Sequence, residues 1–396
     1  MIRHLFRLVW NRRKRHMLLM IEVLFSFLVL FYVNATLASY VSRYLKPLGF
    51  DYERVWKLNL GYYGAGMDIP EEQLKETLAQ LELELNSHRE IETFSWVQGC
   101  MPYGHSTWSS GLDIDGRSVK ANITLADDRL ADALGINLLE GRWFSSEDNA
   151  MEATPIVVNR EMRKDLVGDS AIVGRRFTTE HRDYTVVGVI DQYRFHGEFD
   201  VHKGMFFRRI RPFDSAGTMP DQALIRVRPG VTGRFEQLLL KNLEDIAPGW
   251  NLRIETLTDL RSSYIKDNLL GLLSIGSVAG FLVFNVALGM FGVLWYSINR
   301  RRAEIALRRA LGAGRRGISW QILGEALVLA TIALMAGLFI AMQVPLLGLY
   351  SAIGAFDYTI AMVLSAVAIY ILVFICALYP SRLAMRIVPA QALRDE

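Results

Sequence analysis

The sequence is poor in the residues on which catalytic and metal chemistry depends. Two cysteines in 396 residues, Cys100 and Cys376, exclude a zinc site built from cysteines. The seven histidines are scattered, and His196 and His202 lack the spacing that places two metal ligands on one helix face. No Gly-x4-Gly-Lys-Ser/Thr segment occurs, so these residues hold no phosphate loop for ATP. We therefore expect no catalytic residue, no metal site and no cofactor in this chain.

Charged residues are also missing from most of the long apolar runs. Residues 269–298, 326–349 and 358–379 contain no charged side chain, and residues 17–38 contain only Glu22. About 20 apolar residues cross the hydrocarbon core of a bilayer as a helix. We therefore predict four transmembrane helices, the third preceded by an amphipathic lead-in that begins at 318. The second run would reach roughly 45 Å, against a core of roughly 30 Å, so we expect it to project from the membrane at its first end.

Basic residues gather in the short segments that flank these runs. Residues 1–16 carry six Lys or Arg and 299–317 carry seven, whereas 350–357 carry none. Short loops rich in Lys and Arg stay on the cytoplasmic side of a membrane. We therefore expect both termini to be cytoplasmic, the tail 380–396 included, with 39–268 and 350–357 outside. Nucleic acid is not an expected partner, because the basic residues flank apolar runs instead of lining one soluble face.

Residues 39–268 form one long insertion between the first and second runs. Val55–Leu60 has the composition of a strand, and Pro70–Ser87 carries leucines at helical spacing after a proline and two acids. A second strand–helix–strand pattern spans Ala223–Leu257. We therefore predict an extracytoplasmic α+β domain of two subdomains. The outer subdomain comprises about 50–125 and 220–265, and the inserted one about 126–219.

Three motifs stand in a fixed order around the last three apolar runs. Arg301–Ala313 reads Arg-x-x-Glu-Ile-x-x-Arg-Arg-Ala-Leu-Gly-Ala directly after the second run. Glu325-Ala326-Leu327 opens the third run, and Tyr379–Arg394 follows the fourth with Tyr-Pro near its start and Pro-Ala-Gln-Ala-Leu-Arg at its end. Together with the four runs, these motifs resemble the FtsX-like, MacB-type permeases of ABC transporters.

This resemblance implies a fold and a location. The expected fold is an α-helical membrane protein with four transmembrane helices and a large α+β extracytoplasmic domain between helices 1 and 2. That domain would be a MacB-like periplasmic core of two subdomains. The expected location is the bacterial inner membrane.

The resemblance also assigns a role to the short segment 299–317, which in these permeases engages a separate ATPase. The residues carried over are Arg301, Glu304, Ile305, Leu307, Arg308, Arg309, Leu311 and Gly312. The alternative is an interfacial helix whose arginines contact anionic lipid headgroups. For the amphipathic N-terminal segment 1–16 we expect that lipid-surface role.

Two carboxylates are expected within or at the edge of the spans. Glu22 and Glu325 each lie near the predicted cytoplasmic end of a span, about one turn from an Arg-rich segment. A charge in the membrane is costly unless it is paired or hydrated. Each carboxylate therefore either pairs with the basic segment beside it or is solvated at the headgroup level.

The resemblance, together with the four spans and their orientation, implies a permease subunit of an ABC complex. A partner ATPase would supply ATP and Mg²⁺, and a second permease subunit would complete a homodimer or heterodimer in the lipid bilayer. Motion of the external domain would drive export of an antibiotic, peptide or lipoprotein, with a periplasmic adaptor left open. The alternative is a non-transporting mechanotransmission regulator that activates a periplasmic hydrolase or signals to a sensor kinase.

Overall fold

The computed structural model describes residues 13–62, 69–104, 106–114, 117–168, 170–178, 182–201, 203–210, 219–311, 314–346 and 353–385. The chain divides into two compact units. One, the helical unit, comprises Met1–Ser42 and Leu269–Glu396, and the other, the sheet unit, comprises Arg43–Asn268. Most of the predicted segment 1–16, part of the loop 350–357 and the end of the tail 380–396 lie outside the described residues.

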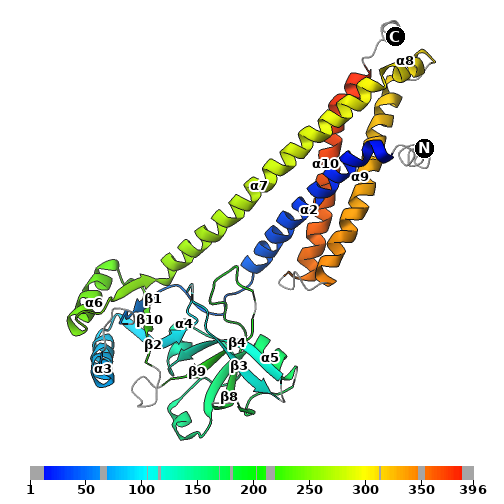
Figure 1. Ribbon diagram of the computed structural model, residues 1–396. Coiled ribbons are helices and arrows are strands. Elements are labelled where there is room, and N and C mark those ends of the chain that lie inside the picture. Colours follow the sequence, from blue (N-terminus) through cyan, green and yellow to red (C-terminus); the bar gives the residue numbers. More distant parts are fainter. Residues whose placement is uncertain are drawn as a thin grey trace. The chain divides into compact units, whose positions relative to one another are not determined.

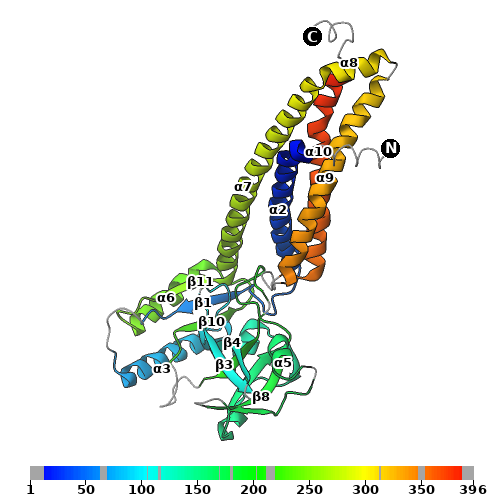
Figure 2. The ribbon, with the colours of Figure 1, turned by 45° about the vertical axis from the view of Figure 1, so that its right-hand side comes forward.

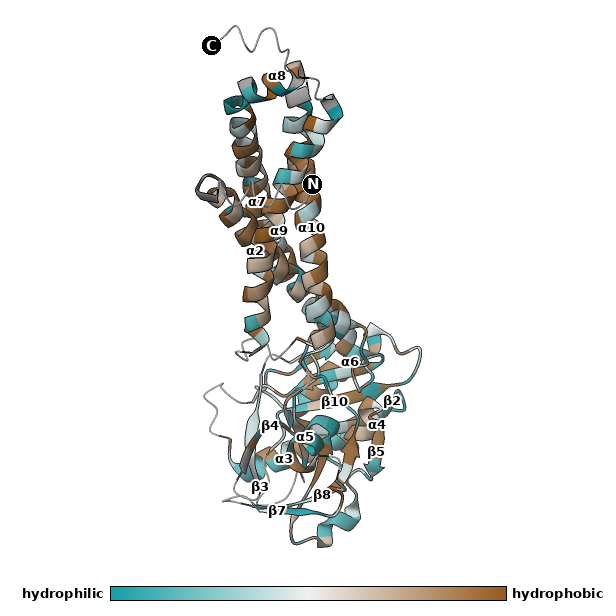
Figure 3. Cartoon of the chain, turned by 90° about the vertical axis from the view of Figure 1, so that its right-hand side faces the viewer, coloured by the Kyte–Doolittle hydropathy of each residue, from teal (hydrophilic) through white to brown (hydrophobic). Residues whose placement is uncertain are grey.

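The helical unit is built from long apolar helices. They are α2 (Arg13–Tyr44), α7 (Leu257–Arg300), α9 (Arg315–Leu346) and α10 (Ala355–Met385), with the short α8 (Arg302–Ala310) between α7 and α9. Figure 3 shows the long helices as largely hydrophobic along their length. Within the described residues, these four helices are long and apolar enough to cross a membrane, as predicted.

Close packing joins α2, α9 and α10. Gly337 leaves room for the Phe27 ring, since a Cβ there would lie 2.6 Å from a ring carbon. The Asn34 amide donates to the Ser365 hydroxyl at 2.9 Å, and Phe31 meets the Tyr358 ring edge to face. Helix α7 differs, because only 6% of its most apolar stretch is buried, against 28–33% in the other three. Most of α7 therefore remains available to lipid or to another protein.

The sheet unit contains one mixed sheet with the order β11-β1-β10-β2-β4-β9-β6-β8-β5. Strand β3 pairs with β4, and β7 pairs with β8. The strands are β1 (Val55–Asn59), β2 (Ile91–Gly99), β3 (Ser109–Ile114), β4 (Arg117–Ala126), β5 (Leu138–Gly141), β6 (Thr154–Asn159), β7 (Arg176–Thr178), β8 (Asp183–Ile190), β9 (Met205–Arg209), β10 (Gln222–Val227) and β11 (Arg253–Thr256). The helices are α3 (Glu71–Ser87), α4 (Leu130–Leu134), α5 (Arg160–Val167) and α6 (Gly233–Ile246), with a 3₁₀ turn at Ser146–Ala150.

The strand–helix patterns predicted at both ends of the insertion are confirmed. Helices α3 and α6 lie beside one another on β1, β2 and β10 (Figure 2). The predicted leucines of α3 are all buried there: Leu74, Leu78, Leu81 and Leu85. Helix α5 instead covers strands β4, β6, β8 and β9 through Met162.

The two predicted subdomains share that single sheet. Strand β4 pairs with β2 on the outer side and with β9 on the inserted side, so the hydrogen-bond ladder is continuous across residue 126. Helix α4, which the sequence places in the inserted part, packs against β2 and β10 of the outer part. The parts are therefore two halves of one sheet (Figure 1).

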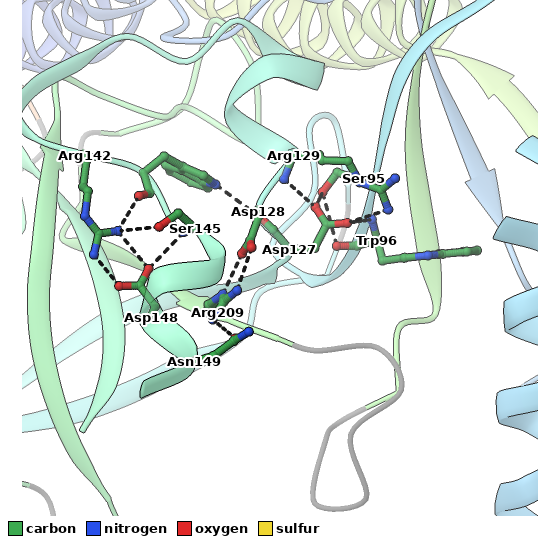
Figure 4. A network of polar contacts seen from close by, with 11 residues as sticks. Ser95, Trp96, Asp127, Asp128, Arg129, Arg142, Ser145, Asp148, Asn149 and Arg209 are labelled. Atoms are coloured by element: carbon green, nitrogen blue, oxygen red, sulfur yellow. Dashed lines mark hydrogen bonds and ion pairs between the residues drawn. The ribbon is translucent and has the colours of Figure 1, made fainter. Parts of the chain in front are cut away.

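A polar network holds the turn after β4, where the two halves meet (Figure 4). The buried Asp127 carboxylate accepts from the Ser95 hydroxyl at 2.5 Å and from the Trp96 amide at 3.2 Å. Arg209 donates a hydrogen bond of 2.6 Å to each carboxylate oxygen of Asp128. Arg142 donates in the same bidentate way to the carboxylate of Asp148. Burial raises the pKa of Asp127, so its hydrogen bonds serve to keep a costly buried carboxyl satisfied.

Candidate functional site

The segment between α7 and α9 is held by a continuous chain of polar contacts. Arg301 donates to Glu325 of α9 at 2.7 Å, and Gln321 donates to the same carboxylate at 3.2 Å. Arg308 of α8 then donates to Gln321 at 2.9 Å and to Glu304 at 2.6 Å. The Arg301 and Glu325 side chains are only 15% and 13% exposed. The sequence motifs after the second span and at the start of the third therefore meet in space.

Apolar contacts fix the same segment from its other side. Ile305 is 7% exposed and Ala306 is fully buried, and both pack against Ile298 of α7 and Ile318 of α9. A small side chain at 306 is required by this contact. Helix α8 is therefore fastened to its neighbours by one buried face and by its polar contacts.

The apolar side chains in and just after α8 do not all lie on one side. Ile305, one of the residues expected to engage the ATPase, points inward, because the isoleucines of α7 and α9 meet it there. Leu307 and Leu311 are 53% and 80% exposed and lie on the outer side. The side chain of Arg309 and the whole of Gly312 lie outside the described residues.

Glu22 of α2 lies against α7. Its Oε1 atom would be 2.7 Å from a Cβ at Gly289, so glycine is what admits the carboxylate. The Oε2 atom is buried and has no hydrogen-bond partner within the described part of the chain. The structure thus places Glu22 at a helix contact, and Glu325 in an ion pair.

A second polar centre lies in the sheet unit, where the chain leaves α2 and later enters α7. We call Arg194–Asp200 the junction loop. Arg194 is 2% exposed, and its guanidinium donates to the carbonyls of Arg43 at 2.9 Å and Lys46 at 3.0 Å. It also donates to the carbonyls of Glu198 and Asp200 within the loop. One buried cation therefore ties the end of α2 to the junction loop.

The junction loop also holds the start of α7. The Glu198 carboxylate, 5% exposed, accepts from Arg261 of α7. Phe199 stacks between Tyr44 of α2 and Tyr264 of α7, with ring centroids 6.1 and 6.4 Å apart. The end of α2 and the start of α7 are thus bound to the same loop.

Gly197 is what allows the loop to approach these rings. Its φ is +82°, a conformation that favours glycine. A Cβ at this position would lie 2.7 Å from a ring carbon of Tyr103 and 3.1 Å from one of Tyr264. The conformation and the contact both require glycine.

Sequence reasoning did not find the junction loop. His196, whose spacing from His202 argued against a metal site, bonds to the Gly104 carbonyl at 2.9 Å and to the Thr107 hydroxyl at 3.0 Å. His202 lies outside the described residues. No local motif marks Arg194, because its partners Arg43 and Lys46 lie about 150 residues earlier in the chain.

Two family models match this chain. The FtsX-like permease C-terminal model matches residues 276–389, and the MacB-like periplasmic core domain matches residues 19–237. The second match covers more than half of the sequence.

Curated relatives match over part of their length. The pyoverdine export ATP-binding/permease protein PvdT of Pseudomonas syringae pv. tomato is 26% identical over 65% of this chain and 40% of its own. The macrolide export ATP-binding/permease protein MacB of Chlorobium phaeobacteroides is 23% identical over 74% of this chain and 44% of its own. The chain therefore spans about two fifths of the length of these relatives.

A solved structure also matches. It is the periplasmic region of MacB from Actinobacillus actinomycetemcomitans, 13% identical, with a TM-score of 0.39 over 56% of this chain and 96% of that one. The two family models, with the four apolar helices, decide the assignment. The chain is a multi-pass membrane protein that belongs to the FtsX-like, MacB-type ABC transporter permease family.

Proposed function

We propose that this chain is a permease subunit that converts ATP hydrolysis by a separate ABC ATPase into motion of its extracytoplasmic domain, for export of a substrate. The observation that carries the proposal is the construction of α8. Its inner face is anchored by Ile305 and by the Arg301–Glu325 pair, while Leu307 and Leu311 remain exposed.

A surface that receives force needs such an anchor. Leu307 on this nine-residue helix and Leu311 just past its end form a small exposed apolar patch, which suits insertion into a groove of a partner. The Arg301–Glu325 pair would pass a push on α8 directly to α9. A helix that only rested on lipid would need no internal ion pair to hold its orientation.

The junction loop supplies the other end of the proposed path. Helix α7 is continuous over 44 residues and runs from the junction loop to Arg301. A continuous helix transmits displacement along its axis because each turn is hydrogen-bonded to the next. On this proposal, α7 carries the stroke to the Glu198–Arg261 pair, and the sheet unit moves with it.

The exposed face of α7 supports a second permease subunit as a further partner. Only 6% of its most apolar stretch is buried within this chain. The same face would otherwise be covered by lipid. The ATP and Mg²⁺ that drive the cycle belong to the partner ATPase.

The test is Leu307→Asp in the full chain. A carboxylate in a desolvated contact costs several kcal/mol when no partner meets it. We expect affinity-purified variant from native membranes to lose both the co-purifying ATP-hydrolysing subunit and the phosphate release seen with wild type. The matched control is Leu83→Asp, at a leucine 70% exposed on α3, which should keep both.

The outcome that rejects the proposal is equally direct. If Leu307→Asp retains the ATP-hydrolysing subunit at the level of Leu83→Asp, α8 is not the docking element. A thermal melt of each purified variant separates lost docking from lost folding, because Leu307 is exposed and its replacement should leave the melting temperature unchanged.

A further inference from the structure

A polar cleft of about 710 Å³ opens in the sheet unit, and its lining includes no residue of the junction loop or of α8. Its walls come from β4, from α5 and from the residues that lead into β9. Ligand sites commonly have volumes of about 300–1,000 Å³. The polar residues that decide its chemistry are Lys120, Asn122, Glu161, Lys164, Asp165 and Lys203.

One of these groups has a buried atom without a partner. The Oε2 atom of Glu161 is buried and lacks a hydrogen-bond partner in the described chain. Asn122, which lines the same cleft, is only 8% exposed. A buried polar group without a hydrogen bond costs about 1–3 kcal/mol, so such groups usually have a partner. Glu161 lines the cleft, which points to a ligand as the partner of its buried oxygen.

The floor of the cleft is rigid. Asn159 is 2% exposed and donates to the Lys203 carbonyl at 2.8 Å. Its side-chain oxygen accepts from the amides of Met162 at 2.9 Å and Met205 at 3.0 Å. One buried amide thus fixes the first turn of α5 to the chain that enters β9. Glu161 and Lys203 are therefore held on a preorganised frame, as a binding site requires.

The charges around the cleft do not neutralise one another. Within the described residues, no ion pair joins Lys120, Lys164 or Lys203 to any carboxylate, including Glu161 and Asp165. The three lysines are exposed, so their charges are available to a ligand. Three cations face two anions, so a ligand with an excess of negative charge is favoured.

We propose that this cleft binds a short acidic peptide. Its carboxylates would meet the three lysines, its terminal ammonium would meet Glu161, and a backbone amide would meet the Asn122 amide, which both donates and accepts. A simple inorganic ion carries charge of one sign only, so it cannot bind favourably to the lysines, to Glu161 and to the Asn122 amide at once. The proposal does not depend on ATPase docking, so Leu307→Asp should leave binding at the cleft unchanged.

The experiment is a calorimetric titration of the purified full chain with tetraglutamate that has free termini. We expect saturable binding that weakens between 50 and 300 mM salt, because the contacts are between partly exposed charges. Lys164→Gln should weaken binding about fivefold, the upper end for one such charge pair. Lys241→Gln, an exposed lysine on α6, is the matched control and should bind as wild type does.

A second titration tests the ammonium contact. Wild type should bind N-acetylated tetraglutamate about fivefold more weakly than the free peptide, whereas Glu161→Gln should bind the two peptides equally. No binding of tetraglutamate to wild type, or equal effects of Lys164→Gln and Lys241→Gln, would overturn the site. Citrate that binds as tightly as tetraglutamate, with no effect of acetylation, would overturn the peptide and leave only a general anion site. Unchanged thermal melts establish that each variant is folded.

Discussion

Replacement of Arg194 by lysine should release the junction loop while keeping its positive charge. The guanidinium reaches carbonyls at both ends of its fork: Arg43 and Lys46 on one side, and Glu198 and Asp200 on the other. A lysine ammonium is a single point with three donors and cannot span both sides. At least two of these carbonyls should lose their partner.

The magnitude follows from the number of bonds lost. Each buried acceptor left unsatisfied costs about 1–3 kcal/mol, so two cost about 3 kcal/mol if each costs about 1.5 kcal/mol. Every 1.4 kcal/mol is a factor of ten in an equilibrium constant. Local opening of the loop should therefore become roughly a hundredfold more frequent.

Hydrogen–deuterium exchange of the full chain in nanodiscs measures this opening. The relevant amides are those of Lys46, which donates to Arg43, and of Gly197 and Asp200 within the loop. They should exchange roughly a hundredfold faster in Arg194→Lys, whereas α3 should be unaffected. The matched control is Arg89→Lys, at a side chain 94% exposed, which should exchange as wild type does. Exchange within twofold of wild type at all three amides would refute the role given to Arg194.

Three further changes test other contacts. Glu325→Gln leaves Arg301 without its carboxylate and should destabilise α8 by about 1–3 kcal/mol, measured as faster amide exchange there, whereas Glu92→Gln in the exposed pair with Arg54 should have little effect. Gly197→Ala should lower the free energy of unfolding by about 2 kcal/mol more than Gly230→Ala does. Both glycines have positive φ, but of the two only Gly197 would place its new Cβ within 4 Å of an aromatic ring. Equal losses in denaturant titrations would contradict this. Burial raises the pKa of Asp221 to about 6. The folded state therefore holds this proton more tightly than the unfolded state, and the resulting stabilisation is lost as pH rises through about 6. Asp221→Asn should be more stable than wild type by about 1–2 kcal/mol at pH 7.5, because the buried charge is then absent, and should show no such gain at pH 4. Thermal melts at the two pH values measure the difference.

Features set by local sequence were predictable. The leucines of α3 recur at three- and four-residue spacing, and hydrophobic periodicity alone places them on one buried face. The apolar helices were equally clear, because about 20 uncharged residues have few alternatives to a membrane span. The Arg301–Glu325 pair could also be anticipated from the sequence, because its two residues belong to motifs that flank a short loop.

Features set by distant contacts were not predictable. Helix α8 has apolar residues at Ile305 and Leu307, and Leu311 follows its end; the sequence does not say which of the three faces inward. That choice depends on Ile298 and Ile318, which belong to other helices. The continuity of the sheet past residue 126 was not predictable for a similar reason, since sheet pairing across β4 is a relation between strands far apart in sequence.

An ion pair holds the chain at each end of α7, and this arrangement bears on how the helix could transmit force. At its start Arg261 pairs with the buried carboxylate of Glu198, and just past its end Arg301 pairs with Glu325. Between them, residues 269–298 carry no charge. Apolar contacts are non-directional and allow a helix to slide or turn, whereas hydrogen-bonded ion pairs fix position and orientation. On the proposed function, the apolar middle of α7 therefore slides past its neighbours, while its two ends stay attached to the junction loop and to α9. Transmission of a displacement from one end to the other requires both properties.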